Sequence, residues 1–322
     1  MTPSYLDKKW TFITPLRTHF DAPPIDEPYS IDVDRCLCRL LRSNAYHIDY
    51  GEDIDMSSDI YIIESFDISN IEKEIQFAKK LKSLGKKIIV GFSADYRFLL
   101  GDCLISPSGT HFSELCKEVD VILSGMHSNV DIYGRYSHKV VDWGLPVERL
   151  NFTKKPYNER EIDILMSASS GEEGLALNME LALTLKEKYP DIRLMYSLQE
   201  VHKERIKPFL NKGIEFVHQY LIDNLVNSKV YINPEIRPRG GRAMLDAWYC
   251  RTPFIACDTT IYSDMFPEYA YTHFNIKNIV EIYDNLRNSN YNSVIQKAEK
   301  RVEEMLFENK IKELMNKLYK GD

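Results

Sequence analysis

The sequence has no CxxC pair, no apolar stretch of membrane-spanning length and no excess of basic residues. Its six cysteines stand in apolar or helical surroundings without the spacing of zinc ligands, so we expect reduced, buried thiols. The 41 basic side chains against 48 acidic ones leave a formal charge of -7, which excludes a histone-like or polybasic membrane-binding protein. The first residues show no basic stretch followed by an apolar run. The sequence therefore predicts a cytoplasmic protein without a transmembrane segment.

The overall amino-acid composition is typical of a globular protein. Hydrophobic residues make up 44% and charged residues 28% of the chain, with 14 Gly and 14 Pro. These values exclude collagen, coiled coil and wholesale disorder. The 322 residues are about twice the length of a typical ~150-residue domain, which indicates two domains or one large one.

Short apolar runs alternate with amphipathic stretches, which is the pattern of βα units that build a parallel sheet. Strands are expected in the first half at 10–16, 45–50, 60–66, 87–93, 119–125 and 139–144. A helix is expected over 71–85, where IEKEIQFAKKLKSLG ends in Gly85. Strands are expected in the second half at 162–168, 192–198, 214–220, 229–235 and 253–258, with helices between them that include 201–210.

Residues 145–160, LPVERLNFTKKPYNER, interrupt this rhythm with two prolines and a cluster of charges. We interpret them as a linker between domains at 1–150 and 151–322. The predicted fold class is therefore α/β, with two Rossmann-like domains facing each other across a cleft. Ligands of open α/β sheets bind beyond the carboxyl ends of the strands, so the strand-to-helix loops are the places to search.

The most informative segment is 231–258, YINPEIRPRGGRAMLDAWYCRTPFIACD. A strand ends at Asn233, and a helix begins after a loop that holds Arg237, Arg239, Gly240, Gly241 and Arg242. Glycines let backbone N–H groups approach an anion, the helix N-terminus is positive, and guanidinium groups are forked donors. The pattern predicts a phosphate site, in which Asp246 could accept hydrogen bonds from ribose hydroxyls. Solvated loop arginines and a surface carboxylate are the alternative.

The same segment resembles the donor-binding domain of GT-B glycosyltransferases. LDAWYCRTPFIA (245–256) is similar to the second half of their E-x7-E motif, with Asp246 in place of the glutamate that holds the ribose. DILMSASSGEEG (163–174) resembles the donor-phosphate loop, and IEFVHQYL (214–221) resembles the strand before the base-binding loop. The resemblance implies further donor contacts at Ser169, Gly171 and Tyr220.

The chain departs from that pattern at two places. Pro238 stands at the first acidic position of the motif, with Glu235 nearby but out of register. The first loop, SASSGEEG, lacks the usual Arg or Lys. Both groups normally contact the donor sugar and its phosphates, so the retaining mechanism of the larger family is in doubt. Arg237, Arg239 or Arg242 could replace the missing charge.

In the first half, KKIIVGFSADYRFLL (86–100) resembles the segment that carries the catalytic aspartate of phage DNA β-glucosyltransferases, with an insertion at Ala94. This resemblance implies that Asp95 is the catalytic base and that Arg97 lies on the acceptor side. A structural helix cap is the alternative role for Asp95. Three histidines in or after loops are further acceptor-side candidates: His19, His111 and His127.

Together the resemblances imply a glycosyltransferase. Residues 1–150 would bind the acceptor and residues 151–322 the nucleotide sugar, with the last helix packing back on the N-terminal domain. A UDP-sugar is the expected donor. No tightly bound metal is expected, because the sequence shows neither an i, i+4 histidine pair nor an EF-hand loop.

The acceptor and the function class leave alternatives. A glycan or small-molecule hydroxyl is preferred, because a charge of -7 suits DNA poorly. A phage-type glycosyltransferase of hydroxymethylpyrimidine in DNA is one alternative, and a non-catalytic nucleotide-sugar-binding module is another. A dehydrogenase or an epimerase with a dinucleotide site is disfavoured, since TPLRTHFDAPP rather than GxGxxG follows the first strand.

Overall fold

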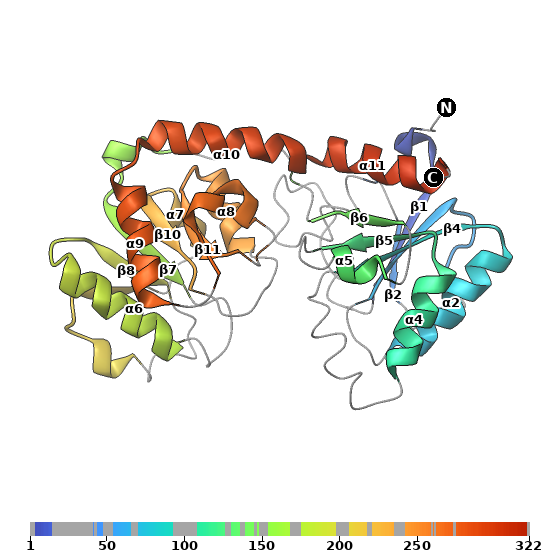
Figure 1. Ribbon diagram of the computed structural model, residues 1–322, viewed down its shortest axis with the longest axis horizontal. Coiled ribbons are helices and arrows are strands. Elements are labelled where there is room, and N and C mark those ends of the chain that lie inside the picture. The colour runs from blue at the N-terminus through green and yellow to red at the C-terminus, as the bar shows by residue number, and fades with distance from the viewer. Residues whose placement is uncertain are drawn as a thin grey trace. The chain divides into compact units, whose positions relative to one another are not determined.

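The chain divides into two compact units, residues 1–148 with 304–322 and residues 149–303 (Figure 1). The computed structural model describes residues 4–14, 41, 44–47, 54–65, 70–92, 108–125, 130–135, 139–144, 147, 154–167, 175–197, 206–217, 221–234, 242–258, 260, 262–272 and 275–320. Each unit contains its own parallel β-sheet. The two sheets define a mixed α/β fold, as the sequence predicts.

The first unit is built on a six-stranded parallel sheet of spatial order β2-β1-β3-β4-β5-β6. Its strands are β1 (Trp10–Thr14), β2 (Asn44–His47), β3 (Ile60–Glu64), β4 (Lys87–Phe92), β5 (Val121–Ser124) and β6 (Val140–Asp142). Its helices include α2 (Ile71–Ser83), α4 (Ser108–Glu118), α5 (Val130–Tyr133) and α11 (Phe307–Tyr319). A 3-10 turn, η1 (Tyr5–Asp7), precedes β1.

Apolar side chains of alternating strand residues form two cores on the two faces of this sheet. Tyr61 and Ile63 of β3 belong to the core that includes residues of α2 and α4. Ile60 and Ile62 belong to the other core, which α11 covers. Residues Phe307, Ile311, Leu314, Met315 and Leu318 of α11 supply that cover. Their spacing of three and four residues puts them on one helix face, so α11 can bury an apolar stripe and leave its charges in solvent. Figure 1 shows α2 and α4 on the side of the sheet away from α11.

The second unit has a six-stranded parallel sheet of order β12-β11-β10-β7-β8-β9. Its strands are β7 (Ile162–Ser167), β8 (Leu194–Ser197), β9 (Ile214–Val217), β10 (Ser228–Ile232), β11 (Phe254–Cys257) and β12 (Ala270–Tyr271). Its helices include α6 (Leu175–Lys188), α7 (Leu221–Leu225), α8 (Arg242–Tyr249), α9 (Ile276–Arg287) and most of α10 (Tyr291–Met305). Short 3-10 turns are η6 (Tyr157–Glu159), η8 (Lys207–Phe209), η9 (Ser263–Met265) and η10 (Pro267–Tyr269).

The strands expected from the sequence are confirmed in both halves, and the two-residue β12 is an addition. The predicted helix over 71–85 is also confirmed: α2 is followed by Gly85 at φ +69°, a left-handed conformation that glycine adopts without strain. The predicted helix over 201–210 is wrong in its described part. Residues 206–210 form only the turn η8, because Pro208 lacks the N–H that a continuing α-helix requires.

Both sheets have a point at which the direction of strand addition reverses. In the first unit β1 lies between β2 and β3, and in the second unit β7 lies between β8 and β10. The crossover connections on the two sides of such a point diverge, which leaves a crevice at the carboxyl ends of the two central strands. The residues that end β1, β3, β7 and β10 are therefore the first candidates for a ligand site.

Candidate functional site

Polar side chains gather at the carboxyl ends of β7 and β10 in the second unit. Ser167 is the last residue of β7, and its hydroxyl lies 2.5 Å from the hydroxyl of Tyr231 in β10. Both side chains are buried, with 7% and 0% of their surface exposed. Ile232 pairs with Met166, so the next residue, Asn233, is level with Ser167. Ser167 and Asn233 thus lie on either side of the switch point, the place between β7 and β10 where the direction of strand addition reverses.

The side-chain amide of Asn233 is buried without a hydrogen-bond partner among the described residues. The residue is 1% exposed, and neither its Nδ2 nor its Oδ1 atom has a hydrogen-bond partner in the part of the chain that the structure describes. Its backbone is fully used: the N–H donates to Ile255 at 3.0 Å, and the carbonyl accepts from the Tyr271 hydroxyl at 3.1 Å. A buried amide without partners costs about 1–3 kcal/mol. An unsatisfied buried amide at a switch point is what we expect of a group that forms its hydrogen bonds with a bound ligand.

Asp246 lies about one turn inside α8, the helix that follows β10 and the Arg/Gly loop. Only 5% of its surface is exposed, so the alternative of a surface carboxylate is wrong. Burial raises the pKa of its carboxyl group to about 8. A carboxyl group with such a pKa can exchange a proton near neutral pH and can form hydrogen bonds to a polar ligand.

Arg160 connects the predicted linker to the segments on both sides of α8. The residue is only 3% exposed, and burial is the main cause that lowers its pKa. Its guanidinium donates to the carbonyl oxygens of Lys155 at 3.0 Å, Ser228 at 2.7 Å and Cys250 at 2.9 Å, and to Thr252 Oγ1 at 2.7 Å. These bonds join residues before β7, the start of β10 and the turn after α8. Arg160 therefore positions the helix that carries Asp246.

The other donor-side predictions lie mostly outside the described residues. This applies to Ser169, Gly171, Tyr220, Arg237, Arg239, Gly240 and Gly241. Arg242 is the first residue of α8, and nothing is described of its side chain. Of the donor-side residues predicted from the sequence, Asp246 is thus the one whose side chain the structure describes.

On the acceptor side, Asp95, Arg97, His19 and His127 also lie outside the described residues. His111 is in the first half of α4, and its side chain is not described. We therefore retain these five residues as predictions.

The carboxyl end of β3 adds a group that the sequence did not indicate. Glu64 ends β3 at the switch point of the first sheet and is 3% exposed. The next residue, Ser65, donates its hydroxyl to Glu74 Oε2 at 2.7 Å, and Glu74 is 1% exposed. Two buried carboxyl groups therefore stand close to the edge at which open sheets bind ligands.

Three observations concern metals, thiols and membranes. No cluster of three or more His, Cys, Asp or Glu side chains able to hold a metal ion occurs among the described residues. Cys116, Cys250 and Cys257 are free, buried thiols, as expected, and burial raises the pKa of Cys116 and of Cys250 to about 12. Within the described ranges no helix combines the length and apolar character needed to cross a bilayer.

Sequence reasoning missed Asn233, Ser167 and Glu64 as candidate site residues. The available signal was a polar residue at the end of an apolar strand, as in Asn233 before Pro234. The signal was incomplete, because only the strand order shows which strand ends meet at a switch point.

Solved structures resemble the chain, although no protein-family model matches the sequence and no curated protein matches it significantly. A variant of S. aureus TarM in complex with fondaparinux, α-GlcNAc-glycerol and UDP aligns with a TM-score of 0.61 at 12% identity, over 84% of this chain and 58% of that one. The chain thus spans little more than half the length of TarM.

Two further neighbours are similar over nearly their whole length. The kitacinnamycin glycosyltransferase has a TM-score of 0.55 at 9% identity, covering 97% of this chain and 99% of its own. UDP-GlcNAc 2-epimerase from Neisseria meningitidis, bound to UDP-GlcNAc, has a TM-score of 0.56 at 11% identity, covering 97% and 100%. These similarities establish that the chain has the fold of GT-B glycosyltransferases, which UDP-sugar enzymes of other activity also have.

Proposed function

We propose that the protein transfers a sugar from a nucleotide-sugar donor, a UDP-sugar, to a hydroxyl group of a glycan or small molecule. The observation that carries the proposal is the buried polar group at the switch point of the second unit, Asn233 with Ser167 and Tyr231, followed by Asp246. In a GT-B fold this edge of the second sheet is where a nucleotide would bind. Neighbours with UDP or UDP-GlcNAc bound support a uridine nucleotide.

Each part of the donor has a proposed contact. The diphosphate would lie against the loop of Arg237, Arg239 and the two following glycines, where the N-terminus of α8 adds positive charge. Asp246 would accept hydrogen bonds from the ribose hydroxyls. The remaining donor-binding residues in the proposal are Ser169, Gly171, Tyr220 and Arg242.

The transfer itself requires a base on the acceptor side. In the proposal Asp95 takes the proton of the acceptor hydroxyl as its oxygen forms a bond to the anomeric carbon. The bond from that carbon to the diphosphate breaks, and the nucleoside diphosphate leaves with the electron pair. The Arg/Gly loop stabilises the negative charge that develops on it. A single displacement of this kind inverts the anomeric centre.

A direct test of the reaction is a screen of UDP-, GDP- and dTDP-sugars with glycan, small-molecule and hydroxymethylated-DNA acceptors. Mass spectrometry detects transfer, and NMR of the sugar distinguishes slow hydrolysis of the donor from epimerisation. Release of nucleoside diphosphate with a new glycosidic bond supports the proposal. A new sugar epimer without transfer would show that the chain shares the activity of the epimerase neighbours, and binding without turnover would indicate a binding module.

Replacing Asn233 with leucine should raise the stability of the ligand-free protein and weaken nucleotide binding. The substitution removes a buried amide that has no partner in the described part of the chain, so the free energy of unfolding should rise by about 1 kcal/mol. The affinity for UDP should fall about tenfold if the amide bonds to the nucleotide. Urea unfolding and calorimetric titration with UDP measure the two effects.

Asn178→Leu is the matched control for this test. Asn178 is 2% exposed, and its amide donates to the Tyr196 hydroxyl at 3.1 Å. That variant should lose stability and keep its UDP affinity. The donor-site assignment of Asn233 would be wrong if Asn233→Leu bound UDP as tightly as the natural protein.

Replacing Asp95 with asparagine should lower the turnover number by at least about a hundredfold, which is the usual contribution of a general base. The dissociation constant for UDP should not change, because the residue belongs to the acceptor half. Turnover is measured as nucleoside diphosphate released in the presence of acceptor. Near-normal turnover by this variant would exclude Asp95 as the base and direct the search to His19, His111 and His127.

A further inference from the structure

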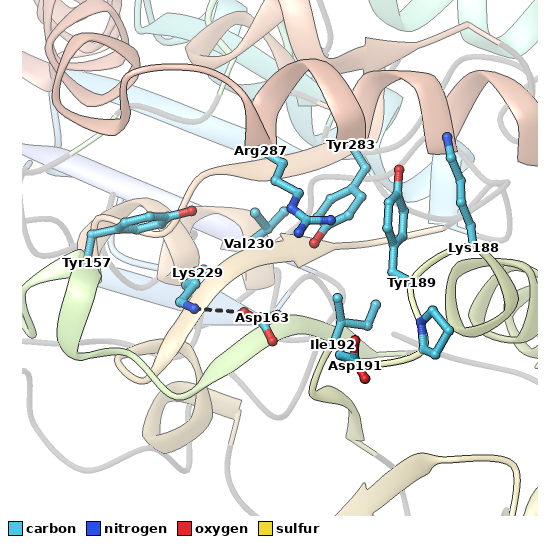
Figure 2. Close-up of a pocket in the computed structure, with 11 residues that line it drawn as sticks. Tyr157, Asp163, Lys188, Tyr189, Asp191, Ile192, Lys229, Val230, Tyr283 and Arg287 are labelled. Carbon is cyan, nitrogen blue, oxygen red and sulfur yellow. Dashed lines mark hydrogen bonds and ion pairs between the residues drawn. The ribbon is translucent and has the colours of Figure 1, made fainter.

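A cavity of about 450 Å³ lies in the second unit, where β7 and β10 begin, at the edge of the sheet opposite to the proposed donor site. Asp163 and Lys229, the second residues of β7 and β10, form its floor, and Tyr283 and Arg287 of α9 line it (Figure 2). Tyr157 of η6 and the turn between α6 and β8 complete the lining. A strand rises about 3.3 Å per residue, so this edge is separated from the carboxyl edge by the length of β7. The cavity is therefore distinct from the proposed donor site.

Three hydrogen-bond donors of the described residues face this cavity. Within the described part of the chain, neither the hydroxyl of Tyr157 nor that of Tyr283 is hydrogen-bonded, and the exposed Arg287 forms no ion pair. Figure 2 shows the two hydroxyls and the guanidinium directed toward the same part of the cavity, beside Val230. Burial raises the pKa of Tyr157 and raises that of Tyr283 to about 12. Both phenols are therefore neutral near pH 7 and keep the proton that they can donate.

The acceptors of the cavity are already occupied. Asp163 accepts from Lys229 Nζ at 2.7 Å through Oδ1 and from the backbone N–H of Arg193 at 2.9 Å through Oδ2. Lys188 also lines the cavity, but its ammonium group is paired with Asp284 and not with Asp163. The remaining carboxylate in the lining, Asp191, is exposed on the turn before β8. Donors are therefore in excess around Arg287, and an acceptor-rich anion would satisfy them.

Ring contacts hold these donors in place. The Tyr157 ring stacks on Tyr291 with centroids 4.3 Å apart and an interplanar angle of 24°. Tyr283 meets Tyr189 edge to face at 5.6 Å, and the Arg287 guanidinium lies 5.0 Å from the centre of the Tyr189 ring. A site with donors fixed in advance loses less entropy when it binds a ligand.

We propose that this cavity binds the phosphate monoester of a small polyol, with the phosphate held by Arg287, Tyr157 and Tyr283. A guanidinium fork matches phosphate oxygens in pairs, and the three terminal oxygens of the ester can meet the three donor groups. The volume of the cavity falls within the range of small-molecule sites and exceeds what orthophosphate alone would fill. The apolar side chains of Val230 and Ile192 provide a surface for the carbon skeleton.

The test is calorimetric titration of the full chain with ribose 5-phosphate, ribose and inorganic phosphate, each with and without saturating UDP. Ribose 5-phosphate is expected to bind at least tenfold more tightly than either of the others, and UDP should not displace it. Arg287→Gln should weaken its binding at least tenfold and leave UDP binding unchanged. Tyr157→Phe and Tyr283→Phe, which keep the rings, should each weaken it by a smaller factor.

Arg301→Gln is the matched control, because Arg301 is an exposed arginine in the same unit that lies near Glu268 and does not line the cavity. It should bind ribose 5-phosphate as the natural protein does. Displacement of ribose 5-phosphate by UDP would show that the phosphate binds in the nucleotide site and would refute the proposal. The proposal would also be refuted if Arg287→Gln bound ribose 5-phosphate as tightly as the natural protein does. The same holds if the natural protein bound ribose or inorganic phosphate as tightly as ribose 5-phosphate. The outcome does not depend on the reaction that the protein catalyses, because no part of the test measures turnover.

Discussion

Replacing Arg160 with methionine should lower the free energy of unfolding of the second unit by about 3 kcal/mol. The guanidinium donates hydrogen bonds to three carbonyl oxygens and one hydroxyl, and its removal deletes all four bonds, of which those to Ser228, Thr252 and Cys250 are buried. Hydrogen bonds to a charged group contribute about 1.5–3 kcal/mol each. Relief of the buried charge offsets part of this loss, since burial is what lowers the pKa of the arginine. Methionine retains an apolar stem of similar length, which limits the cavity.

Arg193→Met is the control for this prediction. Arg193 is 40% exposed at its side chain and forms ion pairs with Glu215 at 2.8 Å and Glu161 at 3.3 Å. Exposed pairs of this kind contribute about 0–1 kcal/mol, so this variant should stay close to the natural protein. Urea unfolding followed by circular dichroism compares the two variants. An Arg160→Met protein within 1 kcal/mol of the control would contradict the positioning role that we assign to Arg160.

Replacing Asp246 with asparagine should change how stability depends on pH. The unfolded chain releases the aspartate proton near its ordinary pKa of about 3.9, whereas the folded chain holds it up to about pH 8. Between these values the folded state binds more protons, so the natural protein loses stability as pH rises, at up to about 1.4 kcal/mol per pH unit. The contribution of Asp246 to stability is complete below pH 4 and lost above pH 8. The asparagine variant lacks this loss.

The measurement is the melting temperature of the natural protein and of Asp246→Asn at pH 5, 6, 7 and 8. The variant should gain stability relative to the natural protein at each step up to pH 8. Asp223→Asn, on the exposed side of α7, controls for the removal of one carboxylate. Parallel pH curves for the natural protein and Asp246→Asn would show that burial does not raise this pKa.

Replacing Asp246 with alanine should weaken the binding of UDP by about 1–3 kcal/mol, because the ribose hydroxyls would lose their acceptor.

Local patterns in the sequence determined most elements of the fold. The strands are short apolar runs, and each was recognised because a buried strand needs apolar side chains on both faces. The end of α2 followed from Gly85, since a left-handed residue after a helix favours glycine. The helix predicted at 201–210 is wrong because Pro208 lacks the N–H that a continuing helix requires, although the apolar spacing is that of a helix. All of these predictions, correct or wrong, rest on residues that are close to one another in the sequence.

The candidate donor site was predicted only in part. The sequence placed an Arg/Gly loop between a strand and a helix, and Asp246 inside that helix, because glycines, arginines and a following amphipathic run are local features. It did not show that Asp246 is buried, which depends on how α8 packs against the rest of its unit. It also did not indicate Asn233, whose amide is buried, without a partner in the described part of the chain, only when β7, β10 and β11 are side by side.

The sequence by itself thus determined the α/β class and the order of the elements along the chain, because these are encoded in periodicity and short-range composition. The tertiary structure decided the strand order, and with it the switch points at which Ser167 stands level with Asn233 and at which Glu64 ends β3. It also decided which groups Arg160 and Arg287 contact. These contacts come from segments far apart in the chain, and no local pattern specifies which distant backbone or ring a guanidinium will contact.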